Sequence, residues 1–187
     1  MQNRNTFLVI LVALSLITLT MDTKNCHADG VVKVIDRRNR SEENQYYIVL
    51  CARDGGVAGH AFVVWGTDDA EKRICSSAAF GLYPRENASR VRILTLGTVP
   101  GEIANEALRG KGSSSTVRLI VKVNSDQYAA TQKIRAKWAA RGKYKLLTRD
   151  CVTFTSTVAK SLGLRLPSRA GNVLPQGFIR SLVQLNN

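Results

Sequence analysis

The hydrophobic period of this chain changes near Val123, and that change limits what the chain can fold into. Residues 116–123 place apolar side chains at every second position, which is the pattern of a half-buried strand. Beyond Val123 the apolar side chains recur every three or four residues, as in an amphipathic helix. No internal repeat or long linker interrupts the 187 residues. We therefore predict one folded domain with strands first and helices second.

The part before Val123 contains short runs of Val, Ile, Tyr and Phe, which favour strands. Two of these runs flank the turn signal Arg53-Asp-Gly-Gly and are expected to form a hairpin-like pair. A loop is expected at residues 81–87, which include Pro84. The predicted strands cover residues 31–35, 46–52, 59–65, 72–79, 90–96 and 116–123.

The first predicted helix begins at Ser125, a favourable N-cap residue. Ala130, Ile134 and Trp138 fall on one face of it, and basic residues occupy the other faces. A short helix is predicted near the end of the chain, over residues 176–185.

A second predicted helix begins at Asp150, which is also a favourable N-cap residue. Gly163 is a natural stop for this helix because glycine adopts the left-handed conformation that ends many helices. One face of the helix is apolar and consists of Cys151, Phe154, Val158 and Leu162.

The first 28 residues have the form of a secretory signal peptide. Arg4 supplies a positive charge, and the uncharged run Phe7–Leu19 is shorter than the roughly 20 apolar residues of a membrane span. Small residues at Cys26 and Ala28 predict cleavage after Ala28 and a secreted or periplasmic protein. The alternative is an uncleaved membrane anchor. The mature chain would be a single domain, residues 29–187.

The net charge of +13 is unevenly distributed. Residues 29–106 carry 10 basic and 11 acidic groups, whereas residues 107–187 carry 15 basic and 2 acidic groups. The basic half predicts an anionic partner, such as a cell-wall polymer or a membrane surface. Nucleic acid is disfavoured because aromatic residues make up only 6% of the chain and no nucleic-acid-binding motif is present. The alternative interpretation is a solvated basic face that aids solubility.

Cys151 differs from the other cysteines because it would occupy the first turn of a helix. There the helix dipole and the basic residues between Arg141 and Arg149 are expected to favour a thiolate. A nucleophilic cysteine needs a base, and His60 is the sole histidine of the predicted mature chain. The alternative is that Cys151 is a small core residue and His60 an ordinary strand residue. The spacing of the cysteines and His60 predicts no metal site, and we expect no cofactor.

The segments Tyr144-Lys-Leu-Leu-Thr-Arg-Asp-Cys151-Val-Thr-Phe154 and Gly59-His60-Ala-Phe resemble the nucleophile helix and the first catalytic strand of permuted papain-fold cysteine hydrolases. This superfamily includes NlpC-like proteins and the lecithin:retinol acyltransferase group. Its order, histidine before cysteine, is the order found here. The resemblance implies an α+β, circularly permuted papain-like fold with an antiparallel sheet packed against the nucleophile helix.

The same resemblance implies that Cys151 is the nucleophile and His60 the general base. It suggests an amidase or endopeptidase that acts on peptidoglycan peptides, with lipid acyl hydrolysis or transfer as the enzymatic alternative. A non-enzymatic basic module that binds an anionic polymer is the alternative from another class.

Two questions stay open at the level of sequence. A third residue that orients His60 could be Ser76, Ser77 or Asp54. Cys51 and Cys75 fall on predicted neighbouring strands, so they could form a disulfide or remain as two buried thiols.

Overall fold

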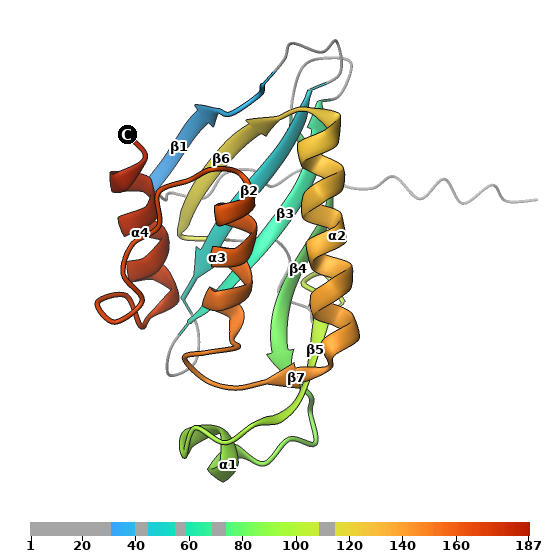
Figure 1. The fold of residues 1–187 in the computed structure, drawn as a ribbon, viewed down its shortest axis with the longest axis vertical. Helices are drawn as coiled ribbons and strands as arrows, with labels where there is room; N and C mark the ends of the chain where they lie inside the picture. The colour runs from blue at the N-terminus through green and yellow to red at the C-terminus, as the bar shows by residue number, and fades with distance from the viewer. Residues whose placement is uncertain (1–30, 40–44, 55–58, 69–73, 109–114) are drawn as a thin grey trace, which may run out of the picture.

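The computed structural model describes residues 31–39, 45–54, 59–68, 74–108 and 115–187 (Figure 1). The predicted signal peptide, residues 1–28, and its cleavage site after Ala28 lie outside these ranges. Within them, none of the helices combines the length and the apolar character needed to span a membrane.

The described residues form one seven-stranded sheet with the strand order β1-β6-β2-β3-β4-β5-β7 and four helices. The strands are β1 (Val31–Asp36), β2 (Tyr46–Arg53), β3 (His60–Asp68), β4 (Ile74–Pro84), β5 (Val99–Asn105), β6 (Val117–Val123) and β7 (Lys143–Tyr144). The helices are α1 (Arg90–Leu94), α2 (Ser125–Arg141), α3 (Cys151–Ser161) and α4 (Pro175–Leu185).

The chain therefore has the expected α+β character, but its sheet is mixed. Strands β2, β3, β4 and β5 form a continuous antiparallel series, and β2 also pairs antiparallel with β6. Strand β1 runs parallel to β6, with Val31 opposite Val117. The antiparallel sheet that the resemblance implies is wrong at this edge, because the resemblance rests on two short motifs outside β1 and β6.

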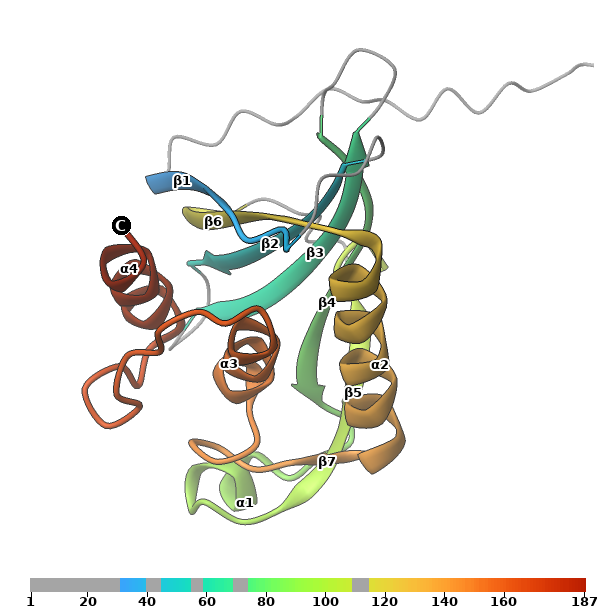
Figure 2. The same cartoon turned by 45° about the horizontal axis from the view of Figure 1, so that its top comes forward.

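Helices α2, α3 and α4 cover one face of the sheet (Figures 1 and 2). Alternation along β3 sends Ala61, Val63 and Trp65 to this face, where they join the main hydrophobic core. Phe62 and Val64 point to the opposite face and belong to a second, smaller cluster. Alternate residues of β3 therefore face opposite sides of the sheet.

Helix α3 follows the prediction closely. Asp150 is its N-cap, and its carboxylate accepts a hydrogen bond from the amide of Thr153, whose side chain bonds back to the amide of Asp150. The predicted apolar face is buried, with Phe154 and Val158 fully enclosed. Gly163 adopts a positive φ of 69° directly after the helix. Capping and termination depend on residues within one or two turns, so the sequence alone predicts them.

Helix α2 differs from its prediction in two details. Its N-cap is Asn124 rather than Ser125, and its buried stripe is centred on Thr131 and Trp138, whereas Ala130 is exposed. Thr131 is tolerated in the core because its hydroxyl accepts a hydrogen bond of 2.9 Å from the indole nitrogen of Trp65. The spacing of apolar residues alone could not predict a threonine in the buried face, because its partner Trp65 is distant in the sequence.

The segment from residue 81 to residue 105 was predicted least well. The expected loop at residues 81–87 is in part the end of β4, which continues to Pro84 because it pairs with β5. The expected strand at residues 90–96 is wrong, since these residues include helix α1, capped by Ser89. Strands β5 and β7 were not predicted, and β7 has only two residues.

Candidate active site

Cys151 is the first residue of α3, and its side chain is buried against the sheet. Its sulfur lies within hydrogen-bonding reach of the backbone amides of Ala61, in β3, and of Val152. Ala61 directly follows His60. The sulfur of the predicted nucleophile therefore lies beside the residue that follows the predicted base in β3.

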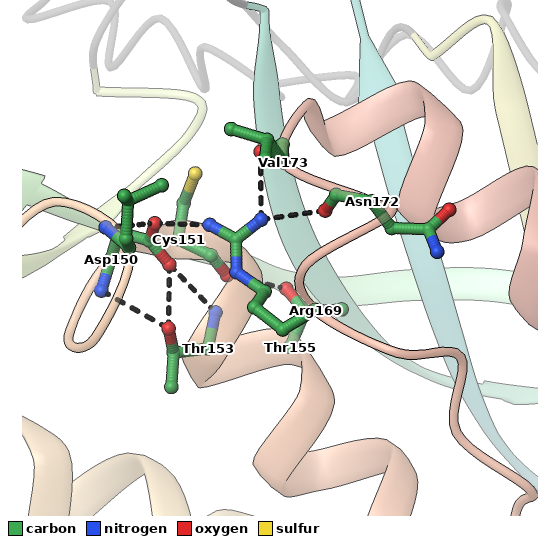
Figure 3. A network of polar contacts seen from close by, with 8 residues as sticks. Asp150, Cys151, Thr153, Thr155, Arg169, Asn172 and Val173 are labelled. Carbon is green, nitrogen blue, oxygen red and sulfur yellow. Dashed lines mark hydrogen bonds and ion pairs between the residues drawn. The ribbon is translucent and has the colours of Figure 1, made fainter.

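The N-terminus of α3 is held by a network centred on Asp150 (Figure 3). This carboxylate is 2% exposed and accepts hydrogen bonds from the amides of Leu147 and Thr153, each at 2.9 Å. The guanidinium of Arg169 lies 2.5 Å from the same carboxylate and also donates to the carbonyls of Asn172 and Val173. Arg169 thus ties the segment before α4 to the start of α3.

The electrostatics of Cys151 contradict the expectation of an activated thiolate. Burial is the main cause that raises the pKa of the thiol, the charge of Asp150 adds to it, and the resulting pKa is about 11. The amides of Ala61 and Val152 and the charge of Arg169 act in the opposite direction but do not compensate. Cys151 is therefore a neutral thiol at neutral pH.

The main reason for this difference is burial of the thiol, and the position of the cations is the second reason. The expected cations, Arg141 to Arg149, precede α3, and Arg141 and Lys143 are exposed to solvent, which screens their charge. The cation that acts on the sulfur is Arg169, which is paired with Asp150. The placement of Cys151 at a helix start was predicted correctly, but desolvation outweighs the helix and the cation.

His60 is the first residue of β3 and lies opposite Arg53 of β2. Its imidazole stacks on the ring of Tyr83, with ring centroids 4.0 Å apart. Nε2 of the same ring lies 3.3 Å from Oε1 of Glu106. The ring is thus held between an aromatic face and a carboxylate.

Glu106 directly follows β5 and is fully buried. Its carboxylate lies 2.5 Å from the guanidinium of Arg53 and accepts hydrogen bonds of 2.9 Å from the hydroxyl of Tyr83. Burial acts to raise the pKa of Glu106, but hydrogen bonds and charges from His60 and Arg53 outweigh burial and lower it. We refer to Arg53, His60, Tyr83 and Glu106 as the His60 cluster.

The residue that orients His60 is therefore Glu106, and the earlier candidates are wrong. Ser76 pairs with Gly66, six residues along β3 from His60, which is roughly 20 Å in an extended strand. Ser77 is adjacent to Ser76 in β4. Asp54 accepts a hydrogen bond from Gln176 of α4. Glu106 could have been found only by predicting β5, because it is the acidic residue at the end of that strand.

Cys151 and His60 lie on opposite faces of the sheet at the start of β3, because Cys151 packs with Ala61 and the His60 ring stacks with Phe62. Strand β4 pairs with β3 from Val63 onward but pairs only with β5 beyond Phe80, so the two strands separate at His60. Ala61 directs its amide toward this separation, because its partner Ala52 directs its carbonyl the other way, to Thr116. The amide therefore meets the sulfur of Cys151 at the separation.

Gly81 lies on the other side of the same separation. A Cβ at this position would lie 2.2 Å from Nε2 of His60 and 2.6 Å from Oε1 of Glu106. The imidazole therefore occupies the space that a side chain at Gly81 would fill. Only glycine allows β4 to pass this close to the ring.

Of the two alternatives for Cys51 and Cys75, the disulfide is wrong, because Cys51 is a free thiol. Cys51, in β2, is a free, buried thiol, and burial raises its pKa to about 12. Strand β3 separates β2 from β4, so Cys51 and Cys75 are not on neighbouring strands. The error follows from assuming that β2 and β4 are adjacent.

Among the described residues, no three His, Cys, Asp or Glu side chains gather in a way that could hold a metal ion. Comparisons with known proteins identify no relative: no family model, no curated protein and no solved structure matches the chain. The function must therefore be argued from the site itself.

Proposed function

We propose that this protein is an exported cysteine hydrolase that cleaves an amide bond through Cys151 and His60. The observation that carries the proposal is the position of the Cys151 sulfur. It starts a helix and faces the amide of Ala61, next to a histidine that is paired with the buried carboxylate of Glu106. A thiol, an imidazole and an orienting carboxylate are the groups that nucleophilic catalysis requires.

In the proposed reaction, the sulfur of Cys151 attacks the carbonyl carbon of the substrate, and His60 takes the thiol proton. The C–N bond of the resulting tetrahedral intermediate breaks, and His60 gives the proton to the leaving amine. A thioester remains on Cys151. Water then attacks the thioester while His60 takes its proton, and cleavage of the C–S bond releases a carboxylic acid and restores the thiol.

The two ring nitrogens of His60 have separate roles in this proposal. Nε2 faces Glu106, so Nδ1 is the nitrogen that would exchange protons with Cys151. Because the thiol is neutral at rest, His60 would remove its proton during the attack. The Thr153 amide is occupied by Asp150, which leaves the Cys151 amide as the helix donor for the oxyanion.

The permuted papain-like fold is part of the same proposal. It is supported by the order of the elements, in which the strand with His60 precedes the helix with Cys151. It is also supported by the packing of α3 on β3, in which the sulfur meets Ala61.

We propose peptides of peptidoglycan as the substrate class. The support is the resemblance of the two short motifs around His60 and Cys151, together with the predicted export. Stem peptides carry carboxylates, and a half-chain with 15 basic and 2 acidic residues would attract them.

The test is digestion of purified peptidoglycan by the wild-type protein, with the released peptides identified by mass spectrometry. Cys151→Ala and His60→Gln should each lower product formation by at least about a hundredfold. Cys51→Ala is the matched control, because Cys51 is a free buried thiol on the opposite face of the sheet, and its loss should leave the products unchanged. Product formation by Cys151→Ala at the wild-type rate would refute the proposal.

Two alternatives make different predictions in the same assay. An acyl hydrolase or acyltransferase of the same fold would leave peptidoglycan intact but would need Cys151 to cleave ester or lipid acyl groups. A non-enzymatic basic module would bind an anionic polymer equally well with and without Cys151.

A further inference from the structure

Helix α1 exposes three large apolar side chains at one end of the molecule. Val91 is 72% exposed, Leu94 is 75% exposed and Leu96, two residues past the helix, is 44% exposed. No residue of α1 is buried. We call Val91, Leu94 and Leu96 the apolar tip.

The backbone of the apolar tip shows that Leu96 is held in an unfavourable position. The amide of Gly97 bonds to the carbonyl of Arg92 at 2.7 Å and that of Leu96 to Ile93 at 3.1 Å, which is the Schellman arrangement. Leu96 occupies its left-handed position, with φ at 59°, where glycine is strongly favoured. A leucine here is strained, and its exposed side chain gains little from burial. The stability of the fold therefore does not explain why residue 96 is a leucine.

Cations surround the apolar tip. Arg85, Arg90 and Arg92 are exposed in the same segment, residues 85–100, which we call the α1 loop. Glu86 is the single acidic residue between Arg85 and Arg92. A hydrogen bond of 3.0 Å from the amide of Arg85 to the carbonyl of Pro100 joins the two ends of the α1 loop. Apolar side chains beside cations suit the boundary between acyl chains and anionic lipid headgroups.

The location of the α1 loop also supports a role in binding a surface. Both views show α1 projecting beyond β7, at the end of the sheet toward which the start of α3 points (Figures 1 and 2). Exposed Lys143 of β7 adds a further cation at this end. A surface that met the apolar tip would face the end of the molecule that carries Cys151.

We infer that the apolar tip inserts into the surface of an anionic phospholipid membrane, with its arginines on the headgroups. The inference is independent of the proposed hydrolase activity. It requires only the exposed apolar side chains, the strained Leu96 and the adjacent cations.

The experiment places a fluorescent reporter at the apolar tip of the full chain. Val91→Trp adds an exposed tryptophan, whereas the native Trp65 and Trp138 are 1% and 8% exposed. Vesicles of brominated phosphatidylcholine mixed with phosphatidylglycerol should quench the new tryptophan. Vesicles of brominated phosphatidylcholine alone should quench it little, because they lack the anionic headgroups.

Two further variants separate insertion from other effects. Leu108→Trp is the matched control, since Leu108 is 86% exposed outside the apolar tip and should not be quenched. Leu96→Gly in the Val91→Trp background relieves the backbone strain and should weaken partitioning about tenfold, the effect of losing one buried leucine side chain. Absence of quenching at residue 91, or equal quenching at residue 108, would overturn the inference. Binding of soluble polyphosphate without any quenching by vesicles would overturn it in favour of a polymer.

Discussion

Glu106 is a buried carboxylate that contacts every other member of the His60 cluster. It is fully enclosed, and Arg53 supplies the charge that balances it. A buried ion pair contributes little net stability, but removing one partner leaves an uncompensated charge. The cluster is therefore sensitive to single substitutions.

We expect Glu106→Gln to lower the free energy of unfolding by about 3–5 kcal/mol near neutral pH, because Arg53 loses its buried partner. The pKa of Glu106 is lowered in the folded state, so its contribution is present above the usual carboxyl pKa and is lost as the pH falls through the folded value. The variant should therefore show a flatter loss of stability in acid than the wild type. Urea denaturation at several pH values measures both effects.

The control for this prediction is Asp36→Asn. Asp36 is also paired with an arginine, Arg38, but on the surface, where the carboxylate side chain is 47% exposed. Its removal should change stability little. Equal losses for both variants would mean that burial of Glu106 is unimportant.

The raised pKa of Cys151 gives a second prediction at the residue scale. Iodoacetamide should alkylate Cys151 more slowly than a model thiol at neutral pH, because a buried neutral thiol is a poor nucleophile. The rate should rise as the pH approaches about 11. His60→Gln should leave this resting rate unchanged, although under the proposed function it should lower hydrolysis at least about a hundredfold. Mass spectrometry of the labelled peptides measures the rates, and fast labelling at neutral pH would contradict a neutral thiol.

At the scale of elements, the site depends on the separation of β3 from β4. The imidazole of His60 occupies the space above Gly81, and the Cys151 sulfur meets the amide that β4 leaves unpaired. If β3 and β4 were paired along their whole length, this amide would bond to β4 and not to the sulfur. The site is therefore a property of the sheet and α3 together.

We expect Gly81→Ala to displace the His60 ring and to lower the free energy of unfolding by about 1–3 kcal/mol, because the added methyl overlaps the ring and the carboxylate. Thermal denaturation and the NMR signals of the imidazole measure the two effects. Gly171→Ala is the control, since a Cβ there meets no atom within 4 Å. An unshifted His60 spectrum in Gly81→Ala would contradict the close packing.

At the scale of the whole molecule, the C-terminal end ties together parts that are distant in sequence. Asn186 is 5% exposed and ends α4. Its side chain accepts a hydrogen bond of 2.9 Å from the amide of Arg165 and donates to the carbonyls of Arg165 and Leu182. It also contacts Arg37, which follows β1. One amide thus joins α4 to the chain after α3 and to the edge of the sheet.

Asn186→Ala should lower the free energy of unfolding by about 1–3 kcal/mol, because it leaves buried backbone groups of Arg165 without their partners. Chemical denaturation measures the loss. Asn187→Ala is the control, because Asn187 is exposed and should tolerate the change. A similar stability for both variants would show that the end of the chain is not a structural clamp.

Much of this molecule follows from local patterns. The hairpin of β2 and β3, the alternation of β6 and the cap, face and stop of α3 were all predicted, since each depends on neighbouring residues. Residues 90–96 were predicted wrongly, because their Val, Ile and Leu favour a strand whereas Ser89 caps a short helix there. Strand β5 was missed because it is defined by long-range contacts. β5 exists through pairing with β4 and β7, and the pattern of residues 99–105 alone does not indicate it.

The sequence by itself determined that Cys151 starts a helix and that His60 starts a strand, because caps and periodicity are properties of short segments. Only the tertiary structure decided that Glu106 is the partner of His60 and that the Cys151 thiol is neutral at neutral pH. Both depend on burial and on contacts between distant segments. The charge of a group in a protein is set by the dielectric and the neighbours around it, and folding creates both.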